Sequence, residues 1–150
     1  MSVQAISAAD SAVPPTPVPL HKEDLKLVDW LTGWNIGIGM AALSIGILLG
    51  ILQGLEHAGL NLYPYIEPAI ASYYHGLSLH GVLNALVWTT FFIVGFFTFA
   101  IVRSLNRPLR YPRVNLIAFW LMVIGLIMTA VPLLTNSASV LYTFLSLIHI

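Results

Sequence analysis

Residues 68–102 read PAIASYYHGLSLHGVLNALVWTTFFIVGFFTFAIV, a run of 35 residues without Asp, Glu, Lys or Arg. About 20 apolar residues suffice to cross the ~30 Å hydrocarbon core of a bilayer. The run is therefore long enough to form a transmembrane helix. Its first half also holds His75, His80 and Asn84, so this span is the place to look for chemistry.

Two more charge-free runs flank the first, at residues 30–55 and 114–150. All charged residues lie outside the three runs, and only 8% of the chain is charged, whereas about 25% is usual for a soluble domain. A soluble protein has a surface to solvate and cannot hold most of its length in such runs. The sequence predicts an all-α integral membrane protein with three transmembrane helices, near residues 31–55, 71–102 and 114–134.

Composition excludes several other classes of protein. The net charge is zero and no basic stripe is present, which argues against nucleic-acid binding. The chain has no cysteine, so it cannot build a disulfide framework, a thiolate metal site or an iron–sulfur cluster.

Residues 1–29 form a leader that we expect to be disordered. Four prolines lie among Ala, Ser and Thr at residues 14–19, a composition that favours an extended, solvated chain. The leader is not a secretory signal by pattern, because its start carries no basic residue. Residues 25–30 are able to begin the first helix as a short amphipathic turn at the membrane surface.

Basic residues predict the orientation in the membrane. The leader has two, the connection at residues 56–67 has none, and the loop at residues 103–113 has four. Because Lys and Arg concentrate on the cytoplasmic side, the leader and the Arg loop are expected in the cytoplasm and the connection outside. Aromatic residues then mark the two interfaces: Trp30 and Trp34 the inner one, and Tyr63, Tyr65, Tyr73 and Tyr74 the outer one.

Glycines in the first span recur at four-residue spacing. They are Gly33 and Gly37, and then Gly46, Gly50 and Gly54. Small residues on one helix face let a second helix approach closely in lipid. The spacing therefore predicts a packing face on the first span.

His80 is the strongest candidate for a functional residue, because an ionisable group within a membrane span is a functional-site hypothesis by default. A metal or heme ligand, a proton relay and a hydrogen bond to a neighbouring helix are the three roles to weigh. Gly76 and Asn84 lie one turn before and after it on the same face. The glycine leaves room for a flat macrocycle, and the amide is able to orient the imidazole ring.

The other histidines are weaker candidates. His75 lies about 140° around the helix from His80, so the two cannot ligate one iron. We expect His75 at the interface, with a part in proton release as the lesser alternative. We expect His57 and His21 to be solvated, and no histidine of the chain to supply a second axial ligand.

The stretch YYHGLSLHGVLNA at residues 73–85 resembles the second helix of subunit I of the heme–copper oxidases, specifically the B-family or ba-type. Residues 130–136 and 140–144 are similar to the end of that family's third helix and the loop after it, and residues 62–64 to its first outer connection. The loop at 103–113 has no acidic residue. The A-family places a proton entrance there, so this loop fits the B-family.

The resemblance implies that residues 30–144 are the first three transmembrane helices of a terminal respiratory oxidase of the cytochrome c oxidase type. Such an enzyme reduces oxygen to water and pumps protons. The resemblance makes His80 an axial ligand of a low-spin heme b, with Gly76 and Asn84 beside it, and places Tyr142 near the gas route. The high-spin heme and copper belong to later helices, so these 150 residues alone are expected to be inactive.

The same resemblance implies partners and a compartment. We expect a subunit II with a copper centre, a cytochrome c or cupredoxin as electron donor, and a prokaryotic plasma membrane. A nitric oxide reductase of the same superfamily and a proton-coupled transporter subunit, with His80 as the proton site, are the alternatives. Residues 145–150 depart from the family pattern and are similar to a translated transposon end used in sequencing libraries. We expect them to be an artefactual tail, in which His149 has no role.

Overall fold

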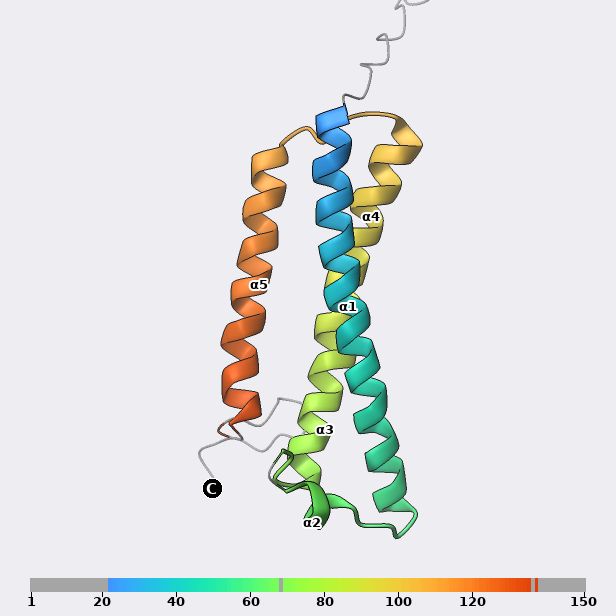
Figure 1. Cartoon of the computed structure of the whole chain (residues 1–150), viewed down its shortest axis with the longest axis vertical. Coiled ribbons are helices and arrows are strands. Elements are labelled where there is room, and N and C mark those ends of the chain that lie inside the picture. The colour runs from blue at the N-terminus through green and yellow to red at the C-terminus, as the bar shows by residue number, and fades with distance from the viewer. Residues whose placement is uncertain (1–21, 68, 136, 138–150) are drawn as a thin grey trace, which may run out of the picture.

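Three long helices make up the computed structural model, which describes residues 22–67, 69–135 and 137 (Figure 1). The first is α1 (Lys22–His57). The second is continuous through α3 (Tyr73–Gly81), the π-helical segment η2 (Val82–Trp88) and α4 (Thr89–Leu105), and the third is α5 (Pro112–Leu134). A short helix, α2 (Tyr63–Ile66), lies in the first connection. All three long helices are long and apolar enough to cross a membrane, which confirms the predicted fold class.

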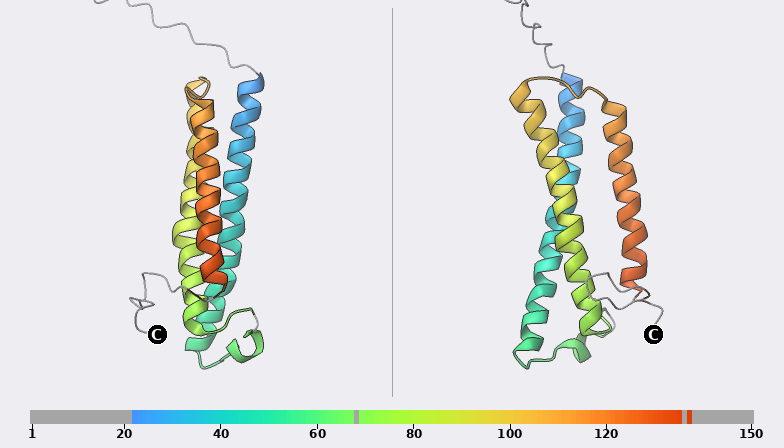
Figure 2. Two further views of the ribbon diagram at one scale, coloured as in Figure 1. Left: turned by 90° about the vertical axis from the view of Figure 1, so that its left-hand side faces the viewer. Right: turned by 180° about the vertical axis from the view of Figure 1, so that it is seen from behind.

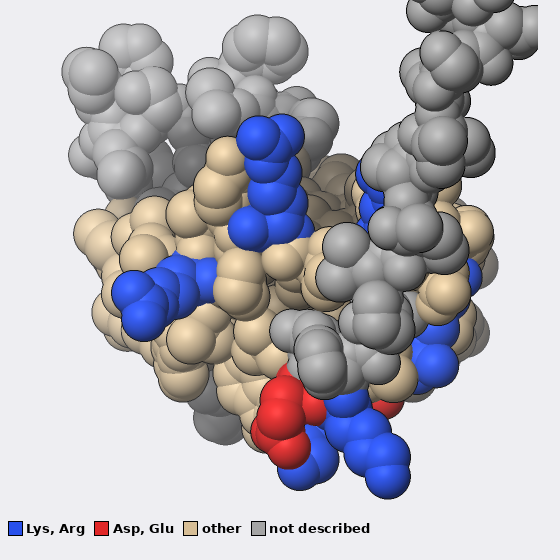
Figure 3. Space-filling model, turned by 90° about the horizontal axis from the view of Figure 1, so that it is seen from above, with Lys and Arg blue, Asp and Glu red and all other residues tan. Residues whose placement is uncertain are grey.

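The three spans run alternately up and down (Figures 1 and 2). The start of α1 and the loop between α4 and α5 lie at one end, and the α1–α3 connection lies at the other. All six Lys and Arg residues belong to the first of these ends, which Figure 3 views from above. There the Arg103 guanidinium pairs with the Asp29 carboxylate at 3.0 Å.

Helix α1 begins at Lys22, so the last eight residues of the leader expected to be disordered, 22–29, are helical. Tertiary contacts account for the difference: Val28 is fully buried, and Asp29 makes the ion pair with Arg103. Local composition alone does not reveal either contact. Residues 1–21 lie outside the described part of the chain.

Glycines allow α1 to pack closely against the second span. A Cβ atom on Gly39 would lie 3.2 Å from the backbone nitrogen of Phe92, and one on Gly50 would lie 2.7 Å from the His80 ring. Gly46 is equally crowded, by Asn84. The predicted packing face is therefore right for Gly46 and Gly50.

For the other three glycines of that pattern, a packing role stays a prediction. A Cβ atom on Gly33, Gly37 or Gly54 would meet nothing within 4 Å. The two spans cross, so that only part of a four-residue stripe faces the neighbour.

Helix α5 packs more loosely than the other two spans, as Figure 2 shows. An apolar cavity of about 350 Å³ separates it from α1 and the second span. Its lining includes Leu49, Leu79, Val87, Leu126 and Leu133. Many large apolar side chains also point outward, among them Leu48 and Met128, which are 64% and 70% exposed. Such outward apolar faces suit contact with lipid.

Candidate functional site

His80 lies in the last turn of α3, half-buried against α1. Its Nδ1 is 2.7 Å from the carbonyl oxygen of Gly46. The ring also lies so close to Gly50 that a Cβ atom there would be 2.7 Å from Cε1. The glycines of α1 thus provide both the hydrogen-bond acceptor and the space for the ring.

The contact with Gly46 fixes the tautomer of His80. A carbonyl oxygen only accepts, so Nδ1 carries the proton and donates it, and in a neutral imidazole the lone pair is then on Nε2. Histidines that bind metals usually donate their other ring N–H to a carboxylate or a backbone carbonyl. The His80 ring therefore has the donor arrangement that an axial ligand requires.

Asn84 lies one turn after His80, with its side-chain nitrogen 3.2 Å from Nδ1. Its Oδ1 is buried and has no hydrogen-bond partner. Because His80 Nδ1 carries a hydrogen, the Asn84 atom that faces it should be the amide oxygen. Exchanging the positions of the Asn84 oxygen and nitrogen would let Oδ1 accept a hydrogen bond from His80 Nδ1–H. A Cβ atom on Gly46 would lie 2.6 Å from the Asn84 Cγ, so Gly46 makes room for this amide as well.

Gly76 faces a different pair of residues. A Cβ atom on it would lie 2.7 Å from Gln53 Nε2 and 2.8 Å from the Tyr63 hydroxyl. Gln53 Nε2 donates to that hydroxyl at 2.7 Å. The space next to Gly76 thus holds a polar contact between α1 and α2, whereas its role beside a macrocycle stays a prediction.

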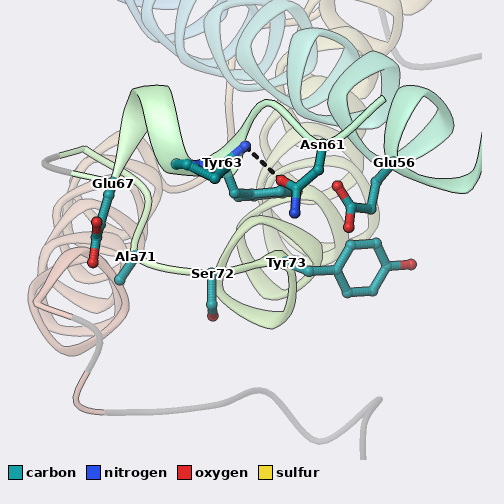
Figure 4. Close-up of a pocket in the computed structure, with 8 residues that line it drawn as sticks. Glu56, Asn61, Tyr63, Glu67, Ala71, Ser72 and Tyr73 are labelled. Carbon is teal, nitrogen blue, oxygen red and sulfur yellow. Dashed lines mark hydrogen bonds between the residues drawn. The ribbon is translucent and has the colours of Figure 1, made fainter. Parts of the chain in front are cut away.

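A polar pocket of about 340 Å³ opens at the same end of the molecule (Figure 4). Glu56, Glu67 and Tyr73 line it, and the Asn61 side chain accepts a hydrogen bond from the Tyr63 backbone N–H at 3.0 Å. Burial raises the pKa of the Tyr63 phenol, and the hydrogen bond from Gln53 lowers it. Within residues 22–67, 69–135 and 137, no three His, Cys, Asp or Glu side chains gather closely enough to hold a metal ion.

His75 lies in the first turn of α3 and is buried in the protein, with only 5% of its surface exposed. Its predicted place at the membrane interface stays a prediction. Its Nδ1 accepts from the Ala71 backbone N–H at 3.2 Å, and its Nε2 donates to the Leu133 carbonyl at 2.6 Å. Both ring nitrogens are occupied, so His75 has no lone pair for a metal. No sequence pattern signals this contact, because Leu133 is 58 residues away.

His57 is exposed, as the sequence predicts. Its Nε2 lies 3.4 Å from the Tyr73 hydroxyl. His21, Tyr142 and residues 145–150 lie outside the described residues, so the predictions for them stay predictions.

Comparisons with known proteins agree with the resemblance. The family model for cytochrome c and quinol oxidase polypeptide I matches residues 31–148. Cytochrome c oxidase subunit 1 of Thermus thermophilus is 41% identical over 112 residues. The aligned region is 71% of this chain and 19% of that protein, so the chain spans a small part of its relative's length.

Proposed function

The chain belongs to the family of cytochrome c and quinol oxidase polypeptide I, and from this membership we propose that it forms the first three membrane helices of a B-family oxidase that reduces oxygen to water and pumps protons. The whole subunit would be an oxidoreductase of the respiratory chain. The role proposed for this part is to hold a low-spin heme b through which electrons pass.

The observation that carries the proposal is the state of the His80 ring. Its Nδ1 proton is held by the Gly46 carbonyl, which leaves the lone pair of Nε2 for an iron atom. Gly50 leaves room for the ring itself, and Asn84 restrains the ring from the next turn. A bound heme would supply reversible one-electron transfer.

The remaining ligands must come from elsewhere in the subunit. His75 uses both ring nitrogens in other hydrogen bonds, and His57 lies at the exposed end of α1. We therefore assign the second axial ligand, the high-spin heme and the copper to later helices. A subunit II with a copper centre and a cytochrome c or cupredoxin donor complete the proposed complex.

The proposed orientation follows from the charged ends of the bundle. The end with all the Lys and Arg residues lies in the cytoplasm of a prokaryote, and the end with Glu56 and Glu67 lies outside its plasma membrane. The Tyr63–Gln53 contact and the polar pocket then face the outer surface.

The experiment is to purify the full-length oxidase that carries this segment and to supply it with reduced cytochrome c or cupredoxin. Oxygen consumption together with a low-spin heme band is the expected result. Reduction of nitric oxide without oxygen consumption would favour the reductase of the same superfamily. Proton-coupled uptake by a protein without a heme band would favour the transporter. The 150-residue chain alone is expected to consume no oxygen, because among the described histidines His80 alone combines a place within a span with a free ring nitrogen.

A further inference from the structure

His75 closes the first turn of α3. Ser72 is the N-cap residue of that helix, and its hydroxyl oxygen accepts from the His75 backbone N–H at 3.2 Å. The His75 ring reaches back in turn, and its Nδ1 accepts from the Ala71 backbone N–H at 3.2 Å. The arrangement resembles a capping box, in which the N-cap side chain accepts from the N3 backbone N–H and the N3 side chain accepts from the N-cap backbone N–H. Here the His75 ring accepts from Ala71, one residue before the N-cap.

The same ring also caps the far end of α5. Its Nε2–H donates to the Leu133 carbonyl at 2.6 Å, one of the last four carbonyls of a helix, which have no partner within it. Over the part of the chain that the structure describes, this is the one hydrogen bond that joins α5 to another span. The other contacts between α5 and the second span are apolar: Phe119 and Leu133 of α5 belong to one buried cluster with Leu79, and the apolar cavity lies beside it.

These contacts select one tautomer of the His75 ring. An acceptor at Nδ1 and a donor at Nε2 together define the neutral Nε2–H tautomer. His80, five residues later on the same helix, takes the opposite tautomer because its Nδ1 donates. His75 is only 5% exposed. If either ring nitrogen lost its partner, water could not readily replace the hydrogen bond, and the buried polar atom would be left unsatisfied.

We propose that His75 is a positioning residue that fixes the end of the third span against the second span. The ring joins the start of one helix to the end of another, and it does so without binding a cofactor. The position of α5 is thereby set relative to the helix that carries His80. This role stands on the two hydrogen bonds and does not depend on heme binding.

Three variants distinguish the hydrogen bond from Ala71 to the His75 ring from the hydrogen bond from the ring to Leu133. The side chain of Gln places a nitrogen near the position of Nε2, so His75→Gln keeps the donor to Leu133. The side chain of Asn places an oxygen near the position of Nδ1, so His75→Asn keeps only the acceptor for Ala71. His75→Leu keeps neither.

The measurement is the distance between spin labels in the full-length subunit, with its other cysteines replaced. Labels at Leu86 and Leu134, which are 49% and 65% exposed, report the second and third spans. Labels at Leu86 and Leu48 report the second span and α1 as a reference pair. The absorption spectrum of the low-spin heme is recorded for every variant.

We expect His75→Gln to give the narrow Leu86–Leu134 distribution of the wild type, and His75→Asn and His75→Leu to give longer and broader ones. The reference pair and the heme band should not change. An Asn variant as narrow as the Gln variant, or a Gln variant as broad as the Leu variant, overturns the proposal, as does loss of the heme band in the Gln variant. If the Leu variant does not fold, the two polar variants decide alone. If the wild type binds no heme, the proposed function fails while the distances still test the role of His75.

Discussion

His75 and His80 lie on the same helix, and their hydrogen bonds, rather than their sequence context, distinguish their roles. His80 donates from Nδ1 to Gly46 and keeps a free lone pair on Nε2, whereas His75 uses both nitrogens to join backbone groups. The helical angle between them predicts that they do not share an iron, and the different partners of the two rings agree with that prediction. The angle was not enough to predict that His75 is buried, because its partner Leu133 lies on another helix.

At the residue scale, Gly50→Ala should weaken heme binding. Its Cβ atom would lie 2.7 Å from the His80 Cε1, and overpacking costs about 1–3 kcal/mol. Since about 1.4 kcal/mol is a tenfold change in an equilibrium constant, we expect heme affinity to fall roughly tenfold. Gly54→Ala is the matched control, because a Cβ atom there meets nothing within 4 Å. Heme titration of both full-length variants tests this, and equal affinities would contradict it.

Helices were the easiest elements to predict, and their contacts the hardest. The charge-free runs located all three spans to within a few residues, except at the start of α1, which tertiary contacts extend to Lys22. The glycine spacing identified Gly46 and Gly50 but also three glycines that meet no neighbour among residues 22–67, 69–135 and 137. Periodicity gives the face of a helix, whereas the crossing of two helices decides which part of that face is covered.

At the element scale, Gly95→Ala should destabilise the packing of α1 on α4. Its Cβ atom would lie 2.9 Å from the Asn35 Cβ and 3.2 Å from the Ile36 backbone nitrogen. We expect a loss of about 1–3 kcal/mol relative to Gly125→Ala, which gains the same helix propensity without a contact within 4 Å. Unfolding of the membrane protein in denaturing detergent measures the difference. A Gly95 variant as stable as the Gly125 variant would show that the two helices do not pack this way.

For the whole molecule, charge and hydropathy were sufficient to predict the architecture. All the Lys and Arg residues lie at one end of the bundle. This is expected, because two transmembrane helices lie between the leader and the Arg loop and bring both to the same side. The function was accessible only through the residues around His80, since composition alone does not separate an oxidase from a transporter. The polar contact that fills the space beside Gly76 was not accessible, because Gln53 and Tyr63 are brought to it by the turn of the chain.

The orientation of the molecule is tested by labelling single cysteines in intact cells. Asn61→Cys, in the α1–α3 connection, should react with an impermeant thiol reagent, and Leu109→Cys, in the Arg loop, should not. The reason is the distribution of basic residues, two in residues 1–29, none in 56–67 and four in 103–113. Labelling at Leu109 without labelling at Asn61 would reverse the assignment.

The central claim is that His80 binds the low-spin heme and His75 does not. The most direct measurement is the reduced-minus-oxidised spectrum of the full-length oxidase carrying either His80→Ala or His75→Gln. Loss of the low-spin band in the first variant and its retention in the second is the predicted result, because alanine leaves the iron one ligand short while glutamine keeps the donor to Leu133. Retention of the band in His80→Ala, with its loss in His75→Gln, would contradict the assignment.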